Sequence, residues 1–189
     1  MNLVATLQTV LTERGAVLQG HFRLSSGRHS NLFVQKFRIL EDPVLVELVA
    51  AQIVREFARA EPTVVVSAAV GGIILGYEVA RQFRTKAIFV EKERGIPALR
   101  RDFVLHESDR AVVVEDVVTT GGSVREVLNV VRQRGAQVVG IGVIVQRSAV
   151  DLGVPTTTLL EIPMASYVAE QCPQCAAGVP LTDPGSRRS

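Results

Sequence analysis

The chain is poor in the features that mark several protein classes. No apolar run reaches the roughly 18 residues of a membrane span, because glycine and serine interrupt the longest one. The first residues show no basic segment followed by an apolar one, so no secretory signal is predicted. A formal net charge of +2 is too small to indicate binding to nucleic acid. We therefore expect a soluble protein of the cytoplasm that binds neither a membrane nor nucleic acid.

Lysine is also scarce, since only Lys36, Lys86 and Lys92 contribute to the 21 basic residues and arginine supplies the rest. Arginine suits bidentate contact with phosphate and carboxylate groups, although genome composition explains such a bias equally well. A chain of 189 residues buries about 70% of its unfolded surface as one domain and needs no disulfide. The expected unit is therefore a single domain over residues 1–189.

Both cysteines lie in one short segment, Cys172–Cys175. A single C-x-x-C supplies half of a tetrahedral zinc site, and the sequence has no second pair. The three histidines, His21, His29 and His106, lie far away in sequence. A redox dithiol stays open, but no thioredoxin-like strand–helix–strand pattern surrounds the segment. We interpret the pair as a non-catalytic element of the tail.

Two common nucleotide-binding motifs are missing. No G-x-G-x-x-G follows a predicted strand, as in dinucleotide-binding folds, and there is no Gly-Lys-Ser/Thr of a nucleoside-triphosphate loop. The most informative segment is instead Val112–Ser123. In it, an apolar run fit for a buried strand ends in two adjacent carboxylates, and a loop of threonine, glycine and serine leads into a helix.

Each part of this segment suits one part of a sugar phosphate. The loop Thr119–Ser123 offers hydroxyls and backbone N–H groups at a helix N-terminus, where phosphate binds favourably. Gly121 and Gly122 allow close approach and a positive φ. Glu115 and Asp116 lie within reach of the attached sugar, and carboxylates accept hydrogen bonds from ribose hydroxyls and bind Mg²⁺. The segment therefore predicts a ribose 5-phosphate site, and the alternative is a glycine-rich turn with surface acids.

Short apolar runs alternate with amphipathic stretches over most of the chain. Buried strands are predicted at 64–66, 87–90, 112–115, 138–145 and 157–162. Helices are predicted over 3–14, from Asp42 to Phe57, from Gly72 to about Arg84, and from Ser123 to Gly135. Residues 16–40 should form short strands and loops, and the end from Pro180 should be loose. This pattern predicts an α/β fold with a mainly parallel sheet, whose ligands bind beyond the carboxyl ends of the strands.

Two further segments are expected at that edge of the sheet. Ser67–Gly72 follows the first core strand, and its small residues suit a diphosphate, although a tight strand–helix connection is the alternative. Glu91–Arg101 is rich in charge, glycine and proline, which predicts an excursion that acts as a lid. A solvated charged hairpin is the alternative there. The basic residues that would meet a leaving diphosphate are Lys92, Arg94, Arg100 and Arg101.

Arg147 directly follows the apolar run that ends at Gln146. A guanidinium at the carboxyl end of a parallel strand grips a planar acid in a bidentate pair. This position therefore predicts contact with a base that carries a carboxylate, and a plain surface arginine is the alternative.

Together these residues resemble the orotate phosphoribosyltransferases, which are type I phosphoribosyltransferases that use 5-phosphoribosyl-1-diphosphate (PRPP). The match runs nearly end to end and is similar to a bacterial and archaeal branch with a short lid. The segments that carry it are His21–Ser30 with its Ser-Gly-Arg, Gly71–Gly76, Glu115–Ser123, and the tail Cys172–Arg187.

The resemblance implies transfer of ribose 5-phosphate from PRPP to N1 of orotate in pyrimidine biosynthesis, with Mg²⁺ required. It implies the type I phosphoribosyltransferase fold, an α/β fold in which helices flank a mainly parallel five-stranded sheet. A small N-terminal hood of about residues 1–40 plus the C-terminal tail would accompany a core of about 43–165. The family works as a homodimer in which each subunit lends its lid to the neighbour.

The resemblance also implies roles for particular residues. Glu115, Asp116 and Lys92 would be catalytic, and Thr119 and Arg147 would contact orotate. No separate metal ligands are expected in the protein, because Mg²⁺ arrives mainly with PRPP. The residues expected to bind PRPP are Glu115, Asp116, Val117, Val118, Thr119, Thr120, Gly121, Gly122, Ser123, Lys92 and Arg94.

The sequence departs from the better-known enterobacterial pattern in three places. Ser25 replaces a lysine, Ala69 and Val70 replace a Tyr-Lys pair, and the lid lacks a Lys-x-His before Gly95. The usual catalytic lysine therefore has no direct counterpart, and no general base is named. Two alternative functions remain, a phosphoribosyltransferase for another base and a PRPP-sensing regulator without catalysis.

Overall fold

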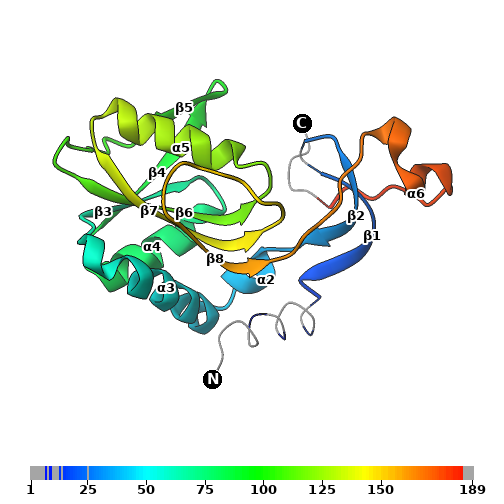
Figure 1. The fold of residues 1–189 in the computed structure, drawn as a ribbon, viewed down its shortest axis with the longest axis horizontal. Helices are drawn as coiled ribbons and strands as arrows, with labels where there is room; N and C mark the ends of the chain where they lie inside the picture. Colours follow the sequence, from blue (N-terminus) through cyan, green and yellow to red (C-terminus); the bar gives the residue numbers. More distant parts are fainter. Residues whose placement is uncertain (1–6, 8, 10–12, 14, 25, 185–189) are drawn as a thin grey trace.

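The structure is a computed structural model that describes residues 7, 9, 13, 15–24 and 26–184. Its core is a six-stranded sheet in the order β5-β4-β3-β6-β7-β8 (Figure 1). The strands are β3 (Val64–Ala68), β4 (Lys86–Glu93), β5 (Ile96–Leu99), β6 (Arg110–Val118), β7 (Gln137–Gln146) and β8 (Thr156–Glu161). All neighbours pair in parallel except β5, which runs antiparallel to β4. The five predicted strands are confirmed, and β5 is an addition from the predicted lid.

Helices cover both faces of this sheet. The helices α3 (Pro43–Phe57) and α4 (Gly72–Phe83) lie on one face and α5 (Gly122–Gln133) on the other (Figure 1). The predicted start of α3 is confirmed, because Asp42 Oδ1 accepts hydrogen bonds from the N–H groups of Val44 and Leu45. The expected helix over 3–14 falls largely on residues outside those the structure describes. Every described helix is too short or too polar to cross a bilayer.

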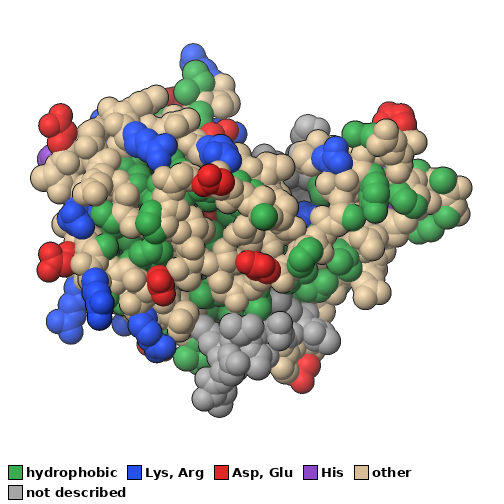
Figure 2. Space-filling model, viewed as in Figure 1, with side chains coloured by type: hydrophobic (Ala, Val, Ile, Leu, Met, Phe, Trp, Pro, Cys, Tyr) green, Lys and Arg blue, Asp and Glu red, His purple; other side chains and the backbone are tan. Residues whose placement is uncertain are grey.

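The chain on either side of the core forms a separate layer, which we call the hood (Figure 1). It contains the antiparallel pair β1 (Val17–Arg23) and β2 (His29–Val34), and the C-terminal segment from residue 163 onward. That segment carries the short helices η2 (Ala169–Gln171) and α6 (Pro173–Ala176). Hydrophobic side chains stay at the hood surface (Figure 2).

The hairpin and the C-terminal segment are joined through their backbones. Tyr167 and His29 exchange two hydrogen bonds of 2.8 Å. The N–H of Thr182 donates to the carbonyl of His21, and the N–H of Arg23 donates to the carbonyl of Thr182. The prediction of a loose end from Pro180 is therefore wrong for Thr182, because the strand edge of β1 binds its backbone.

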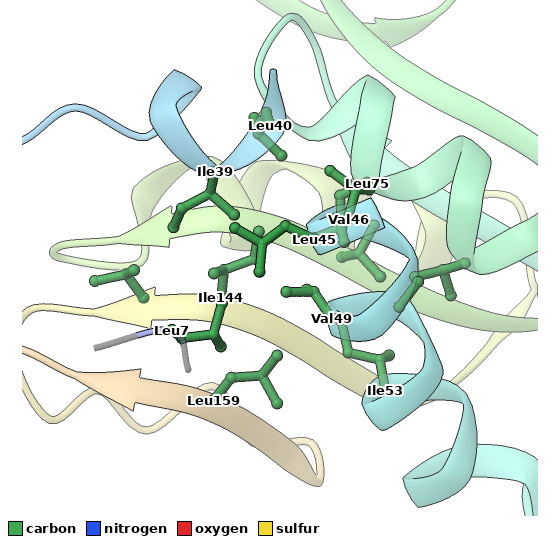
Figure 3. Packing of buried hydrophobic residues seen from close by; sticks show 14 of the residues in the cluster. Leu7, Ile39, Leu40, Leu45, Val46, Val49, Ile53, Leu75, Ile144 and Leu159 are labelled. Atoms are coloured by element: carbon green, nitrogen blue, oxygen red, sulfur yellow. The ribbon is translucent and has the colours of Figure 1, made fainter. Parts of the chain in front are cut away.

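A short helix, α2 (Phe37–Leu40), connects the hood to the core. Its residues Ile39 and Leu40 are buried against Leu45 and Val46 of α3, in the cluster that also contains Leu75 and Ile144 (Figure 3). This helix was not predicted, since four residues are too few to show a helical period. Its burial fixes the position of the residue just before it, Lys36.

Candidate active site

The two glycine-containing loops of the core flank one crevice. β3 and β6 are neighbours in the sheet, but the chain leaves β3 toward β4 and leaves β6 toward β7. The two strand–helix connections therefore turn away from each other at the carboxyl ends of β3 and β6. Such a reversal opens a crevice in which ligands of parallel sheets bind. The segments Ser67–Gly72 and Asp116–Ser123 lie on its two sides.

The loop after β6 presents the start of α5 to this crevice. Gly121 has a φ of 78°, and a Cβ there would lie 2.9 Å from Val150 and 3.0 Å from Leu152. No side chain caps α5, so its first-turn N–H groups are available to an anion. The hydroxyl of Ser148 donates to the carbonyl of Thr119 at 2.6 Å and holds the loop. The loop lines a small pocket, and the phosphate site expected there stays a prediction. The pocket is lined by Glu115, Val117, Val118, Thr119, Gly121, Gly122, Ser123 and Val124.

The two carboxylates at the end of β6 are both buried. Val112 and Val114 face α3 and α4, whereas Val113 faces α5. Glu115 lines the pocket at the start of α5, and Asp116 lies beside Gly71 at the start of α4. Asp116 Oδ1 accepts a 2.6 Å hydrogen bond from the N–H of Val117.

The environment favours the protonated form of Glu115. Burial raises the pKa of Glu115 to about 8, and the negative charge of Asp116 adds to this effect. The Lys36 ammonium acts in the opposite direction but does not outweigh them. A buried acid whose pKa is displaced next to a charged partner is typical of a functional site.

Lys36 was not predicted as a site residue. Its Nζ lies 2.6 Å from Asp116 Oδ2, and a third of its side chain is exposed. It follows β2 and reaches the crevice because the buried α2 holds the chain beside the core. The only hint in the sequence is that lysine is a scarce residue in this chain, because no local motif marks position 36.

Gly71 is required where the loop after β3 passes the Lys36–Asp116 pair. A Cβ at Gly71 would collide with the Asp116 carboxylate and the Lys36 ammonium. The loop itself contains a cis peptide bond between Ala69 and Val70, and the N–H of Ala69 donates to Val90 at 2.8 Å. The following helix α4 also has no side-chain cap at its start. Two uncapped helix N-termini therefore face the same crevice.

The predicted lid is a β-hairpin of β4 and β5, so the charged-hairpin alternative describes its form. Lys92 Nζ lies 2.8 Å from Glu126 on α5, and Arg101 Nε lies 2.9 Å from Glu91. Arg100 Nη2 lies 3.6 Å from Glu93. Arg94 occupies the exposed turn with a φ of 51°. None of the described contacts joins these four basic residues to Glu115 or Asp116, and their roles stay predictions.

Arg147 lies beside the phosphate loop, as expected. Its N–H donates to the carbonyl of Val118 at 2.9 Å, so it adjoins Thr119 at the carboxyl ends of β6 and β7. Burial lowers the pKa of the Arg147 guanidinium, and its buried Nε has no hydrogen-bond partner among the described residues. An unpaired buried N–H is costly, and an anionic ligand would satisfy it.

The raised pKa of Glu115 predicts a pH effect on stability. The unfolded chain loses the Glu115 proton near pH 4.5 and the folded protein near pH 8, so the free energy of unfolding should fall between these values. The slope from this group is at most about 1.4 kcal/mol per pH unit. Urea unfolding at several pH values should show this fall in the unsubstituted protein and in the exposed-site control Glu107→Gln, and a weaker one in Glu115→Gln. Equal slopes in all three would contradict the buried, protonated state.

Known proteins share both the sequence and the fold. Residues 39–154 match the phosphoribosyl transferase domain family. An orotate phosphoribosyltransferase of Pelotomaculum thermopropionicum is 48% identical over 95% of each chain, and one of Caldicellulosiruptor bescii is 42% identical over the full length of both. The crystal structure of orotate phosphoribosyltransferase from Aeropyrum pernix is 28% identical, with a TM-score of 0.71 over 82% of this chain and 93% of its own. The chain therefore belongs to the orotate phosphoribosyltransferase family, within the phosphoribosyl transferase domain family.

Proposed function

We propose that the protein transfers ribose 5-phosphate from PRPP to N1 of orotate, giving orotidine 5′-monophosphate and diphosphate. The observation that carries this proposal is the buried acid pair beside the uncapped start of α5, at the crevice between β3 and β6. The relatives named above are orotate phosphoribosyltransferases over nearly their whole length. The hood and the core would act together as one domain, and the reaction would take place in the cytoplasm.

PRPP would lie across the crevice. Its 5-phosphate would accept hydrogen bonds from the first-turn N–H groups of α5, and its ribose hydroxyls would donate to Glu115 and Asp116. The diphosphate would then point toward Gly71 and the start of α4. Lys36 would orient Asp116, because its ammonium contacts the carboxylate directly.

Mg²⁺ fits this arrangement as a companion of PRPP. Glu115 and Asp116 supply the hard oxygen ligands that Mg²⁺ prefers, but Lys36 already contacts one oxygen of Asp116. The ion would therefore be held mainly by oxygens of PRPP. When bound, it neutralises charge on the leaving diphosphate.

Arg147 would hold the base. An orotate carboxylate at this strand end would pair with the guanidinium and satisfy the free Nε. Thr119, at the adjacent strand end, would contact the same ring.

The chemistry needs charge stabilisation rather than a strong base. The anomeric carbon passes through a cation-like state as the diphosphate leaves, and orotate N1 is acidic enough to attack as an anion. Catalysis then depends on positioning and on stabilising separated charge. Lys92 and Arg94 on the β4–β5 hairpin would approach the diphosphate when the lid closes, after Lys92 leaves Glu126.

The active form would be a homodimer with lids shared between subunits. Five large apolar side chains on α3, on α4 and just before α4 are exposed, which is costly on a monomer surface and suits a second copy of the same face. They are Val44, Leu48, Val70, Ile74 and Tyr77.

A loss of either carboxylate should slow the reaction. Asp116→Asn and Glu115→Gln should each lower kcat about 100-fold or more, because each removes a preorganised carboxyl group that would orient the ribose hydroxyls. The measurement is the fall in orotate absorbance on adding PRPP and Mg²⁺. Glu107→Gln, which changes an exposed acid before β6, should keep the normal rate. Near-normal kinetics in both site variants would refute the assignment.

The guanidinium of Arg147 should govern the choice of base. Arg147→Lys should raise the KM for orotate about 10- to 100-fold and leave the KM for PRPP nearly unchanged, since a charged hydrogen bond contributes about 1.5–3 kcal/mol. Arg132→Lys, on the exposed surface of α5, is the matched control.

A panel of bases tested with PRPP separates the alternative functions. Turnover of a purine or of uracil in preference to orotate would favour a phosphoribosyltransferase for another base. PRPP binding without turnover of any base would favour a regulator.

A charge on the exposed apolar face should break the dimer. Tyr77→Asp should raise the dissociation constant of the dimer about 30-fold or more, as loss of a central apolar anchor does at other interfaces. Light scattering after size exclusion would measure it, with Val104→Asp, an exposed apolar site before β6, as control. A dimer that persists in Tyr77→Asp, or a monomer in the unsubstituted protein, would place the interface elsewhere or remove it.

A further inference from the structure

Four side chains of the types that bind metal ions meet in the hood, outside the core sheet. His21 comes from β1, His29 from β2, and Cys172 and Cys175 flank the start of α6. Their ligand atoms all lie within 4.8 Å of one another. We call these four residues the hood cluster. Sequence reasoning missed this cluster because the histidines lie more than 140 residues before the cysteines. Only the pairing of the tail with the hairpin brings them together.

The spacing of the ligand atoms matches a tetrahedron. His21 Nε2 lies 3.0 Å from His29 Nδ1, 3.4 Å from Cys172 Sγ and 3.6 Å from Cys175 Sγ. Cys175 Sγ lies 3.2 Å from His29 Nδ1. Ligands on a tetrahedral zinc ion are separated by about 3.3–3.8 Å, given bond lengths of about 2.3 Å to sulfur and 2.0–2.1 Å to nitrogen. The four pairs given above lie at or slightly below this range, and the remaining pairs lie within 4.8 Å, so small side-chain shifts would bring all four atoms onto one ion.

Hydrogen bonding alone does not account for this convergence. His21 Nδ1 lies 2.7 Å from the carbonyl of Val179, and a carbonyl only accepts, so Nδ1 carries the proton. The lone pair of Nε2 then faces His29, Cys172 and Cys175 together. The Nε2 lone pair can accept one good hydrogen bond. A cation at the centre would accept the lone pairs of all four groups. The Val179 carbonyl also fixes the ring, as outer partners of zinc-bound histidines do.

Burial and charge fit the same ion. His21, His29 and Cys172 are buried and Cys175 is exposed, which leaves one side open for metal entry. Two thiolates and two neutral imidazoles balance the charge of Zn²⁺, so the filled site is neutral. Four protein ligands leave no open position for a substrate, which is typical of a structural zinc site.

We propose that the hood cluster binds one structural zinc ion, which ties the C-terminal segment to the β1–β2 hairpin. A two-stranded sheet is marginally stable by itself, and the hood has little apolar core. The described links between its two parts are hydrogen bonds and one exposed ion pair, Arg23–Asp183. The hydrogen bonds are the backbone bonds at Tyr167 and Thr182, the bonds of Arg28 to Ser166, and the bonds Ser30–Ala165, Gln174–Gly20 and His21–Val179. A metal joining both strands to the tail would stabilise the hood. This proposal is independent of the reaction assigned above.

The first test is the metal content of the full chain purified from cells grown with added zinc. We expect about one zinc ion per chain by mass spectrometry of the elements. X-ray absorption should show two sulfur ligands at about 2.3 Å and two nitrogen ligands at about 2.0–2.1 Å. Absence of zinc, a different metal at that stoichiometry, or coordination without sulfur would overturn the proposal. So would a Cys172–Cys175 disulfide in the freshly purified protein.

Substitutions then locate the ion. Cys172→Ser and Cys175→Ser should each lower the zinc content about tenfold, whereas His106→Gln, which changes the exposed third histidine, should keep it. Chelation of zinc should lower the melting temperature of the unsubstituted protein by about 5 °C or more, and should leave an already zinc-free Cys172→Ser protein unchanged. Equal zinc content in all variants would refute the site. If the cysteine variants fail to fold, the content and X-ray absorption of the unsubstituted protein decide.

Discussion

The adjacency of β3 and β6, with their chains leaving in opposite directions, is the constraint on which the site depends. It brings two uncapped helix starts to one crevice, and it places the end of β6 between them. Glu115 and Asp116 are buried there because the sheet is covered on both faces. Two buried carboxyl groups at such a position are unfavourable without ligands, and under the proposed function a sugar phosphate with its metal ion would satisfy them.

The ion pair between Lys36 and Asp116 joins the hood to this chemistry. Lys36 belongs to the connection between β2 and α2, whereas Asp116 belongs to the core. Burial of Ile39 and Leu40 holds the connection, so the hood and the proposed sugar site share one structural support. A hood that shifts would therefore change the charge around Asp116. The stability of the hood therefore bears on the proposed activity, because it fixes the position of Lys36 beside Asp116.

The sequence predicted the core well because its signals are local. Apolar runs located the five parallel strands, and Asp42 with Pro43 located the start of α3. The segment from Glu115 to Ser123 predicted a sugar-phosphate site because its carboxylate, hydroxyl and glycine residues lie next to one another in the sequence. The position of Arg147 beside the end of β6 was expected because strand ends in a parallel sheet share an edge, and its contact with a base stays a prediction.

The residues that the sequence did not reveal depend on contacts between distant segments. Lys36 reaches Asp116 only through the packing of α2, and no local pattern marks it. The hood cluster needs a hairpin and a tail to pair across more than 140 residues. The lid was predicted as an excursion, but its hairpin form depends on β5 pairing with β4 at the sheet edge. Long-range pairing of this kind leaves no periodicity in the sequence.

The most direct test of the account is a crystal structure with PRPP and Mg²⁺ bound. The account predicts the 5-phosphate at the first turn of α5, the ribose hydroxyls on Glu115 and Asp116, and the diphosphate at the loop before α4. A sugar phosphate bound outside the crevice, or one whose hydroxyls do not contact either carboxylate, would contradict it.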